Sequence, residues 1–283
     1  MRIGSNPLRH QKLPQAPNRV AAVITHLPDD RGYHSERLEV VQLSLRSLRA
    51  NAGCEVPVLV WDNGSCPALT DWLVHDFRPE TLILSPNVGK SSARASIFHM
   101  VPPDTLLGMA DDDMLYHPGW WTAQEELLTA FANVGAVSGY PTRAMFRWGT
   151  RNTIAWARQH GEVEVGNFMP KEWHREYCLS VGLPQLTQEI INTDEVRITV
   201  DGQQAYAQAH HCQFLAVAGR IAPLTKWNDE GTSHERAFDE SIDEAGYLRL
   251  TTPQRLTQHM GNVLDDDLRA LAAEFGLLEG VHA

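Results

Sequence analysis

The stretch Leu106-Leu107-Gly108-Met109-Ala110-Asp111-Asp112-Asp113 decides the fold. Its residues up to Ala110 are uncharged and mostly apolar, as in a short buried strand, and three consecutive carboxylates follow at once. Adjacent carboxylates repel each other and are costly at a strand end unless a positive group compensates them. The divalent cations Mg²⁺ and Mn²⁺ prefer oxygen ligands and commonly fill this role. The stretch therefore predicts a strand that ends at a metal site.

Strands and helices are expected to alternate through the first half of the chain. Short apolar or β-branched runs predict strands at residues 20–25, 56–61, 81–84 and 134–140. Apolar residues at helical spacing lie between them, as from Leu38 to Leu48, where Ser35 is expected to cap the helix. Such alternation implies a largely parallel sheet, and ligands bind beyond the carboxyl ends of its strands. We therefore expect Asp62, residues 87–90 and residues 111–113 to meet at one edge.

The pattern changes after residue 140. Residues 143–156 mix basic, aromatic and glycine residues and are expected to form a loop, or lid, over the site. Alternation over residues 196–200, followed by Asp201-Gly202, predicts a β-hairpin. A second acidic triplet, Asp265-Asp266-Asp267, opens an amphipathic pattern that reaches Leu278. Because carboxylates cap helix amides and complement the helix dipole, this triplet needs no metal to explain it.

Composition narrows the class of protein. With 43% hydrophobic and 21% charged residues, the chain resembles an ordinary soluble globular protein. Its net charge of -11 argues against nucleic-acid binding, but not against a nucleotide bound through a cation. The four cysteines show no C-x-x-C spacing, and no apolar run approaches the roughly 20 residues that a membrane span needs. We expect a cytoplasmic protein with reduced thiols and no transmembrane segment; peripheral membrane attachment and oligomeric state stay open.

Three motifs in order carry a resemblance to a known family. They are Trp61-Asp62-Asn63-Gly64-Ser65, then Asn87-Val88-Gly89-Lys90 with Arg94, then the acidic triad followed by Pro118-Gly119-Trp120. Over residues 20–140 this resembles family 2 glycosyltransferases of the GT-A fold. The resemblance implies an α/β protein whose Rossmann-like, mostly parallel central sheet is flanked by helices. We expect a single domain with four parts: a polar arm (1–17), a nucleotide-sugar-binding half (18–140), a mixed acceptor-side half (141–262) that includes the lid and the catalytic acidic segment, and a C-terminal helix (263–283).

The resemblance also implies an activity. A metal-dependent transferase of this family moves a sugar from a nucleotide-diphosphate donor, such as a UDP-sugar, to a hydroxyl of a saccharide or small-molecule acceptor. The residues that it places at the donor are Asp62 on the base, Lys90 and Arg94 near the base and diphosphate, and Asp111 on the ribose or a metal-bound water. Each has a plainer alternative: Asp62 also suits a turn, Asp111 also suits a solvated turn at a strand end, and the two basic residues also suit an exposed helix surface.

The same resemblance assigns the metal and the remaining carboxylate of the triad. Asp113 and the late His259 are expected to hold Mn²⁺ or Mg²⁺, and Asp112 to orient its neighbours or the sugar. Imidazole is an acceptable ligand for Mn²⁺. The alternative for His259 is a strand-end histidine that forms only local hydrogen bonds.

An inverting transferase needs a base for the acceptor hydroxyl. The family places an acidic pair about a dozen residues before a Gly-Tyr, and counting back from Gly246-Tyr247 reaches His234-Glu235. Glu235 is therefore the first candidate and Asp239 the second. Their competitors are Glu240, Asp229 and Glu230, and an ordinary acidic helix surface is the alternative for all of them.

Aromatic side chains near the site suggest sugar stacking. Trp148 and Trp227 are expected to contact the acceptor, whereas Trp120 is expected to pack in the core. His210-His211 has no third ligand at metal spacing and is interpreted as structural.

Two other function classes remain. A sugar nucleotidyltransferase on a similar sheet would need a glycine-rich, basic phosphate loop after its first strand, and residues 26–32 are too acidic and too poor in glycine. A non-catalytic GT-A-like binding module is disfavoured by the intact carboxylates at 111–113. The donor base and sugar, the acceptor and the stereochemical outcome are not fixed by the sequence.

Overall fold

Parallel strands form the first half of the central sheet in the computed structural model, which describes residues 17–226 and 234–278. In spatial order they are β3 (Thr81–Ser85), β2 (Val58–Asn63), β1 (Arg19–Thr25) and β4 (Leu106–Asp111). The segments between them contain η1 (Gly32–His34), α1 (Arg37–Ala50), α2 (Pro67–Trp72), η2 (Leu73–Phe77) and α3 (Lys90–Met100). The alternation expected from residue 20 to residue 111 is confirmed.

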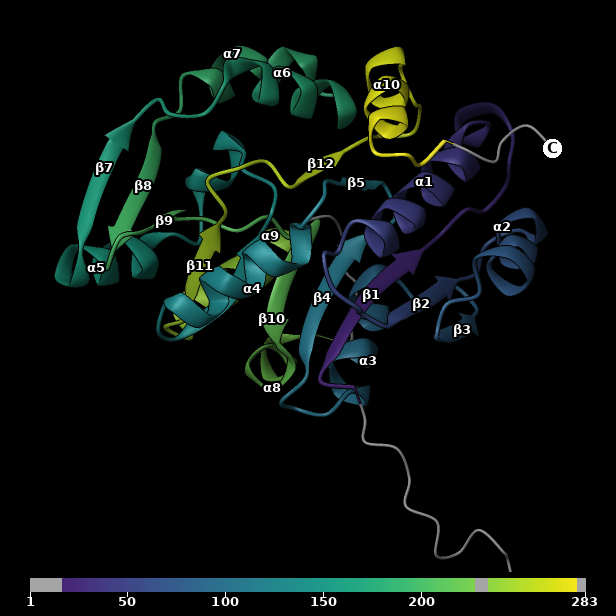
Figure 1. The fold of residues 1–283 in the computed structure, drawn as a ribbon, viewed down its shortest axis with the longest axis horizontal. Coiled ribbons are helices and arrows are strands. Elements are labelled where there is room, and N and C mark those ends of the chain that lie inside the picture. The colour runs from purple at the N-terminus through teal and green to yellow at the C-terminus, as the bar shows by residue number, and fades with distance from the viewer. Residues whose placement is uncertain (1–16, 227–233, 279–283) are drawn as a thin grey trace, which may run out of the picture.

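The second half of the sheet mixes strand directions. After β4 come β10 (Gln213–Val217), β6 (Val134–Ser138), β11 (Leu248–Thr251), β9 (Gln203–Tyr206), β8 (Glu195–Val200) and β7 (Glu162–Gly166). Strands β10, β9 and β7 run opposite to the other strands of this sheet. Most strands therefore share one direction, as expected for an α/β protein with a Rossmann-like, mostly parallel sheet. Figure 1 shows β3 at one end of the sheet and β7 and β8 at the other.

Two apolar cores cover the two faces of the parallel strands. Along β1, Ala21 and Val23 face one core, whereas Ala22 and Ile24 face the other, because successive side chains of a strand point to opposite faces. Helices α1 and α4 (Trp120–Ala130) pack on the first face, and Trp120 lies there fully buried, as predicted. Helices α3 and α9 (His234–Glu244) pack on the second. Figure 1 shows α1 and α4 in front of the sheet and α3 behind it.

A second, two-stranded sheet carries His259 to the acidic triad. Strand β5 (Met114–Tyr116) directly follows the triad and pairs antiparallel with β12 (Thr257–His259), with His259 opposite Met114. The backbone N–H of Met260 donates to the carbonyl of Asp113 at 2.8 Å. This pairing places His259 beside Asp113, although the two residues are far apart in the sequence.

The C-terminal region behaves as the second acidic triplet predicts. Helix α10 (Asp266–Glu274) begins directly after Asp265, whose carboxylate accepts a hydrogen bond from the Leu268 N–H at 2.8 Å. Asp266 and Asp267 lie in its first turn, where negative charge is favourable. The predicted hairpin is also confirmed, since Asp201 and Gly202 take the positive φ values of a tight turn between β8 and β9.

Two local predictions are wrong. Residues 143–156 do not form a loop: they contain η3 (Arg143–Arg147) and the start of α5 (Arg151–His160), and Arg143 and Met145 are buried. The arginine is buried because it pairs with Glu195, which explains why a basic stretch packs inside. Ser35 does not cap α1, because Glu36 holds the N-cap position and makes no side-chain cap. The remaining helices are α6 (Lys171–Ser180), η4 (Pro184–Leu186), α7 (Thr187–Ile191), α8 (Ala218–Ile221) and η5 (Ala222–Leu224).

Within residues 17–226 and 234–278, no helix combines the length and the apolar character needed to cross a membrane. The expected polar arm lies almost entirely outside the described residues, as does Trp227.

Candidate functional site

The carboxyl ends of β1, β2 and β4 meet at one edge of the sheet, as the sequence predicted. Thr25, the last residue of β1, donates its hydroxyl to Asp62 Oδ1 at 3.1 Å, and the next residue, His26, donates its backbone N–H to Asp112 Oδ2 at 3.1 Å. The motif after β3 joins them, because Val88 donates its backbone N–H to Asn63 Oδ1 at 2.9 Å. These bonds hold the polar stretches in fixed positions around the strand ends.

Asp62 is engaged by its own turn. It is 2% exposed, and its second oxygen, Oδ2, accepts from the Ser65 backbone N–H at 3.1 Å. Both oxygens therefore already have partners in the protein. A role in reading a base requires that the ligand add to this arrangement or replace one of these bonds.

Asp112 and Asp113 share one guanidinium, that of Arg37 at the start of α1. Its Nη2 lies 2.5 Å from Asp112 Oδ1 and its Nη1 lies 2.9 Å from Asp113 Oδ2. The same Nη1 donates to the carbonyl of Gly261 and to Asn262 Oδ1. We call Arg37, Asp112, Asp113 and His259 the Arg37 cluster. Arg37 was not predicted from the sequence, where it is one arginine at the beginning of an amphipathic helix.

Burial and neighbouring charges shift the pKa values of Asp112 and Asp113 in opposite directions. Burial raises the pKa of Asp112 to about 6, and the neighbouring Asp113 acts in the same direction against the attraction of Arg37. The pKa of Asp113 lies well below its usual range, because His259 and Arg37 together outweigh its burial. Asp113 Oδ2 is 3.2 Å from His259 Nε2, and this contact raises the pKa of His259 although burial opposes it. The His259 Nδ1 contacts Ser180 Oγ at 2.9 Å.

Asp111 belongs to a second group, centred on Glu235 in the first turn of α9. Lys90, at the start of α3, lies 2.8 Å from Asp111 Oδ2 and also pairs with Glu235 Oε1. Arg94, one turn further along α3, reaches the same Glu235 oxygen at 3.4 Å. Although burial acts in the opposite direction, Lys90, His211 and Arg94 hold the pKa of Glu235 well below its usual range. Lys90 is thus the link between the acidic triad and α9.

His211 and Asp239 lie behind Glu235. His211 Nε2 is 2.9 Å from Glu235 Oε2, and His211 Nδ1 is 2.9 Å from Asp239 Oδ2. The other Asp239 oxygen lies 2.6 Å from Arg249 Nη2, in β11. Glu235 retains 32% side-chain exposure, whereas Asp239 retains 2%. We call Lys90, Arg94, Asp111, His211, Glu235, Asp239 and Arg249 the Glu235 cluster.

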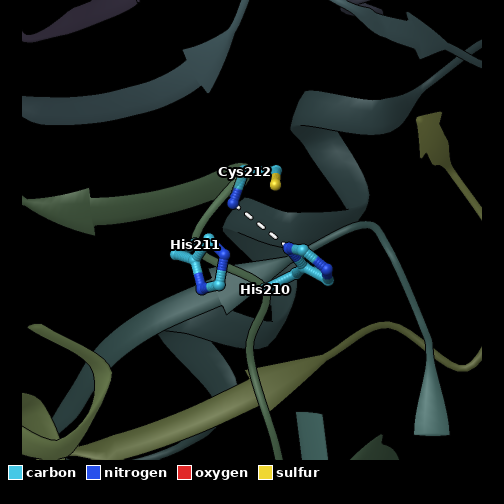
Figure 2. Close-up of side chains that lie close together, drawn as sticks. All are labelled: His210, His211 and Cys212. Atoms are coloured by element: carbon cyan, nitrogen blue, oxygen red, sulfur yellow. Dashed lines mark hydrogen bonds between the residues drawn. The ribbon is translucent and has the colours of Figure 1, made fainter. Parts of the chain in front are cut away.

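Strand pairing explains why His211 reaches this cluster. Strand β10 runs antiparallel to β4, and the Asp111 N–H donates to the Cys212 carbonyl at 2.8 Å. Figure 2 shows His210, His211 and Cys212 on the segment that leads into β10. The sequence does not reveal that residues 106–111 pair with residues 213–217. His211 was therefore interpreted only as structural, and Arg249 was missed.

His210, His211 and Cys212 bring three potential metal-ligand atoms within 4.8 Å of one another, so Cys212 supplies the third group that spacing alone did not suggest. The nitrogens of His211 are already bonded to carboxylates, however, and His210 Nδ1 accepts from the Cys212 N–H at 3.2 Å. Burial also raises the pKa of the Cys212 thiol to about 12, which opposes the thiolate that metals need. We therefore interpret these residues as part of the Glu235 cluster and not as a metal centre.

Trp148 packs next to the start of α9. The guanidinium groups of Arg147 and Arg236 lie over its ring, at 5.8 and 5.6 Å from the ring centre. Its indole nitrogen is buried and has no hydrogen-bond partner within the part of the chain that the structure describes. The ring thus contacts α9 at Arg236, the residue after Glu235.

Comparison with known proteins leaves the family open. No protein-family model matches the chain, and no curated protein matches it. Among solved structures, it is similar to a mannosyltransferase from Pyrobaculum calidifontis in complex with GDP-Man and Mn²⁺, at 14% identity and a TM-score of 0.47, over 91% of this chain. It spans only 60% of the length of that enzyme. It is also similar to the inositol-1-phosphate CTP transferase from T. maritima, at 12% identity and a TM-score of 0.47, over 94% of this chain and 98% of the other. Both similarities are too low to assign an activity.

Proposed function

We propose that this protein is a metal-dependent glycosyltransferase that uses a nucleotide-diphosphate sugar and a hydroxyl acceptor. The observation that carries the proposal is the pair of clusters at the end of β4: Asp112 and Asp113 with His259 on one side, Asp111 with Lys90 and Glu235 on the other. Asp113 and His259 of the Arg37 cluster suit a cation that binds a diphosphate, and Glu235 of the Glu235 cluster suits removal of a proton from an acceptor. The two are separated by a single peptide bond, which is the proximity that a transfer reaction needs.

The residues present fit a divalent cation. Asp113 Oδ1 is buried and has no hydrogen-bond partner among the described residues, and His259 Nε2 lies beside the same carboxylate. Asp113 and His259 would hold Mn²⁺ or Mg²⁺, and the donor oxygens would complete the coordination. The cation would neutralise the leaving diphosphate as a Lewis acid. Both oxygens of Asp112 already have partners, the Arg37 guanidinium and the His26 N–H, so Asp112 is left to position its neighbours.

The donor has room and positive charge beside the triad. An open groove of about 710 Å³ lies next to the ends of β1 and β2, close to Asp62, and offers a place for the nucleoside. Its lining residues are Pro28, Asp29, Asp30, Arg31, Gly32, Cys66, Pro67 and Ala68. Lys90 opens α3, where the helix dipole favours anions, and is suited to the diphosphate.

Glu235 is the better of the two candidates for the base. Its exposure allows contact with an acceptor, whereas Asp239 is enclosed. The acceptor hydroxyl would give its proton to Glu235 while its oxygen bonds to the anomeric carbon. The bond from that carbon to the diphosphate oxygen then breaks, and the electron pair leaves with the nucleoside diphosphate. Attack from the face opposite the leaving group gives inversion.

Lys90 couples donor binding to this step. Without a donor, Lys90 pairs with Glu235 and lowers its pKa, which makes the carboxylate a poor proton acceptor. A diphosphate beside Asp111 would compete for the Lys90 ammonium group. Loss of that contact would raise the pKa of Glu235 and so strengthen the base.

Release of nucleoside diphosphate tests the proposal. A panel of nucleotide sugars is incubated with Mn²⁺ or Mg²⁺ and a set of saccharide and small-molecule acceptors, and nucleoside diphosphate is quantified with and without chelator. The expected result is acceptor-stimulated release with one donor class, removed by the chelator. Release of pyrophosphate from a nucleoside triphosphate and a sugar phosphate would instead indicate a nucleotidyltransferase. Binding of nucleotides without release of any product would indicate a binding module.

A further inference from the structure

The geometry points to His211 as the positioning residue for Glu235, an inference that rests on the proposed function. Each ring nitrogen contacts one carboxylate at 2.9 Å, Nδ1 on Asp239 and Nε2 on Glu235. A neutral imidazole carries one N–H and can donate to only one of them, so two such contacts to ionised carboxylates require the doubly protonated ring. His211 is therefore a cation between two anions, with its ring plane fixed at both ends.

Asp239 and Arg249, which lie on the other side of His211 from Glu235, are both buried. Asp239 is 2% exposed and its Oδ1 pairs with Arg249, whose guanidinium is buried and also donates to the carbonyls of Gly149 and Ala209. Arg249 lies in β11, at the core of the sheet. The orientation of His211 is thus set by the sheet, through Asp239 and Arg249.

Glu235, at the other end of this chain of contacts, is the more exposed of the two carboxylates that His211 contacts. Glu235 Oε1 is shared by Lys90 and Arg94, while Oε2 is held by His211. When a donor draws Lys90 away, His211 is the contact that keeps the Glu235 carboxylate in one orientation. It would leave Oε1 directed at the acceptor, so that a single oxygen receives the proton. His211 does not itself touch the reacting atoms in this arrangement.

The charges around His211 and Glu235 come from several elements. Asp239 and Glu235 face His211 from α9, Cys212 and His210 adjoin it on its own segment, and Tyr177 faces it from α6. Lys90 and Arg94 face Glu235 from α3. Although burial opposes it, the hydrogen bonds to the carboxylates of Asp239 and Glu235 raise the pKa of His211 well above its ordinary value. Removal of its charge would raise the pKa of Glu235.

Two substitutions at His211 test the role. An amide nitrogen in His211→Asn can replace Nδ1 and keep the Asp239 contact, whereas His211→Gln can reach the position of Nε2 and keep the Glu235 contact. With the donor and acceptor identified above, His211→Asn is expected to lower kcat about 10- to 100-fold with little change in the KM for the donor. In the pH profile of kcat, the fall in activity on the acid side (the acid limb) should occur at higher pH in His211→Asn than in the unmodified protein. His211→Gln should recover part of kcat. Glu244→Gln, exposed in the last turn of the same helix, is the matched control and should change neither kcat nor the pH profile.

The outcomes separate this inference from the proposed function. If the unmodified protein turns over no donor, the proposed function fails and the role of His211 fails with it. If it turns over a donor and His211→Asn leaves kcat and the acid limb unchanged, only the role of His211 fails. A fall in activity that is equal at every pH would also overturn it, since that indicates a general structural defect. Nitrogen NMR of the unmodified protein gives an independent measurement: both His211 ring nitrogens should be protonated at pH 7.5, and a neutral ring there would contradict the inference.

Discussion

Replacing Arg37 with Gln should destabilise the fold more than any exposed arginine would. The Arg37 side chain is 12% exposed and pairs with two carboxylates, Asp112 and Asp113, that are 7% and 13% exposed. Glutamine keeps part of the side-chain volume but no charge, so both carboxylates lose their common counterion. Removing one partner of a buried ion pair costs about 3–5 kcal/mol, and here one guanidinium serves two partners. We therefore expect a loss at the upper end of that range at pH 8.

The size of this loss should depend on pH. Burial already raises the pKa of Asp112 to about 6 with Arg37 present, and loss of the guanidinium should raise it further. The folded variant then binds a proton at a pH where the unfolded chain, with a carboxyl pKa near 3.8, does not. Since the native state binds more protons, stability falls as pH rises through this interval. The destabilisation of Arg37→Gln should accordingly be smaller at pH 5 than at pH 8.

Urea denaturation followed by tryptophan fluorescence, in the presence of a chelator, measures both effects. Arg31→Gln is the control, because the Arg31 side chain is 91% exposed and should leave the free energy of unfolding unchanged. Equal midpoints for the two variants at pH 8 would refute the counterion role of Arg37. A larger loss at pH 5 than at pH 8 would refute the account of Asp112.

Three further predictions follow from individual contacts. His117→Gln should reduce the loss of stability at acid pH. Burial lowers the pKa of His117 to about 4, so the unfolded chain gains a proton first, which costs the native protein at most about 3 kcal/mol between pH 6.5 and 4. Denaturant unfolding at several pH values, with His160→Gln as the control, measures this, and parallel curves for the two variants would contradict it. Asp265→Ala should lose about 1 kcal/mol by removing the cap of α10, whereas Asp267→Ala should lose less; equal losses in thermal unfolding would argue against the cap. Glu235→Gln should lower kcat for sugar transfer by about 100-fold or more without weakening nucleoside diphosphate binding, because Lys90 is then free for the diphosphate; product release and calorimetry measure the two effects, and retained turnover would remove Glu235 as the base.

Much of the fold could be predicted because it is local. The strands at 20–25 and 106–111 are short apolar runs, and a strand buried on both faces needs no partner information to be recognised. The second acidic triplet was interpreted correctly for the same reason: a cap acts on amides of its own helix. Local chemistry was sufficient in these cases.

Failures in the sequence analysis arose where the decisive contact is distant in the chain. Residues 143–156 look like a polar loop until Glu195 supplies a buried partner for Arg143. The convergence of residues 62, 90 and 111–113 at one edge of the sheet was predicted, because it follows from the parallel strands. Arg37 was missed and His211 was interpreted as structural, because their contacts depend on side-chain pairing and on the insertion of β10 beside β4, which periodicity cannot indicate.

The most direct test of the central claim is calorimetric titration of nucleoside diphosphates in the presence and absence of Mn²⁺. The protein carries its own control, since Asp113 and Asp266 belong to two acidic triplets of the same composition. We predict that one nucleoside diphosphate binds only with Mn²⁺, that Asp113→Asn removes this binding, and that Asp266→Asn retains it. Undiminished Mn²⁺-dependent binding by Asp113→Asn would contradict the assignment of the triad at the end of β4.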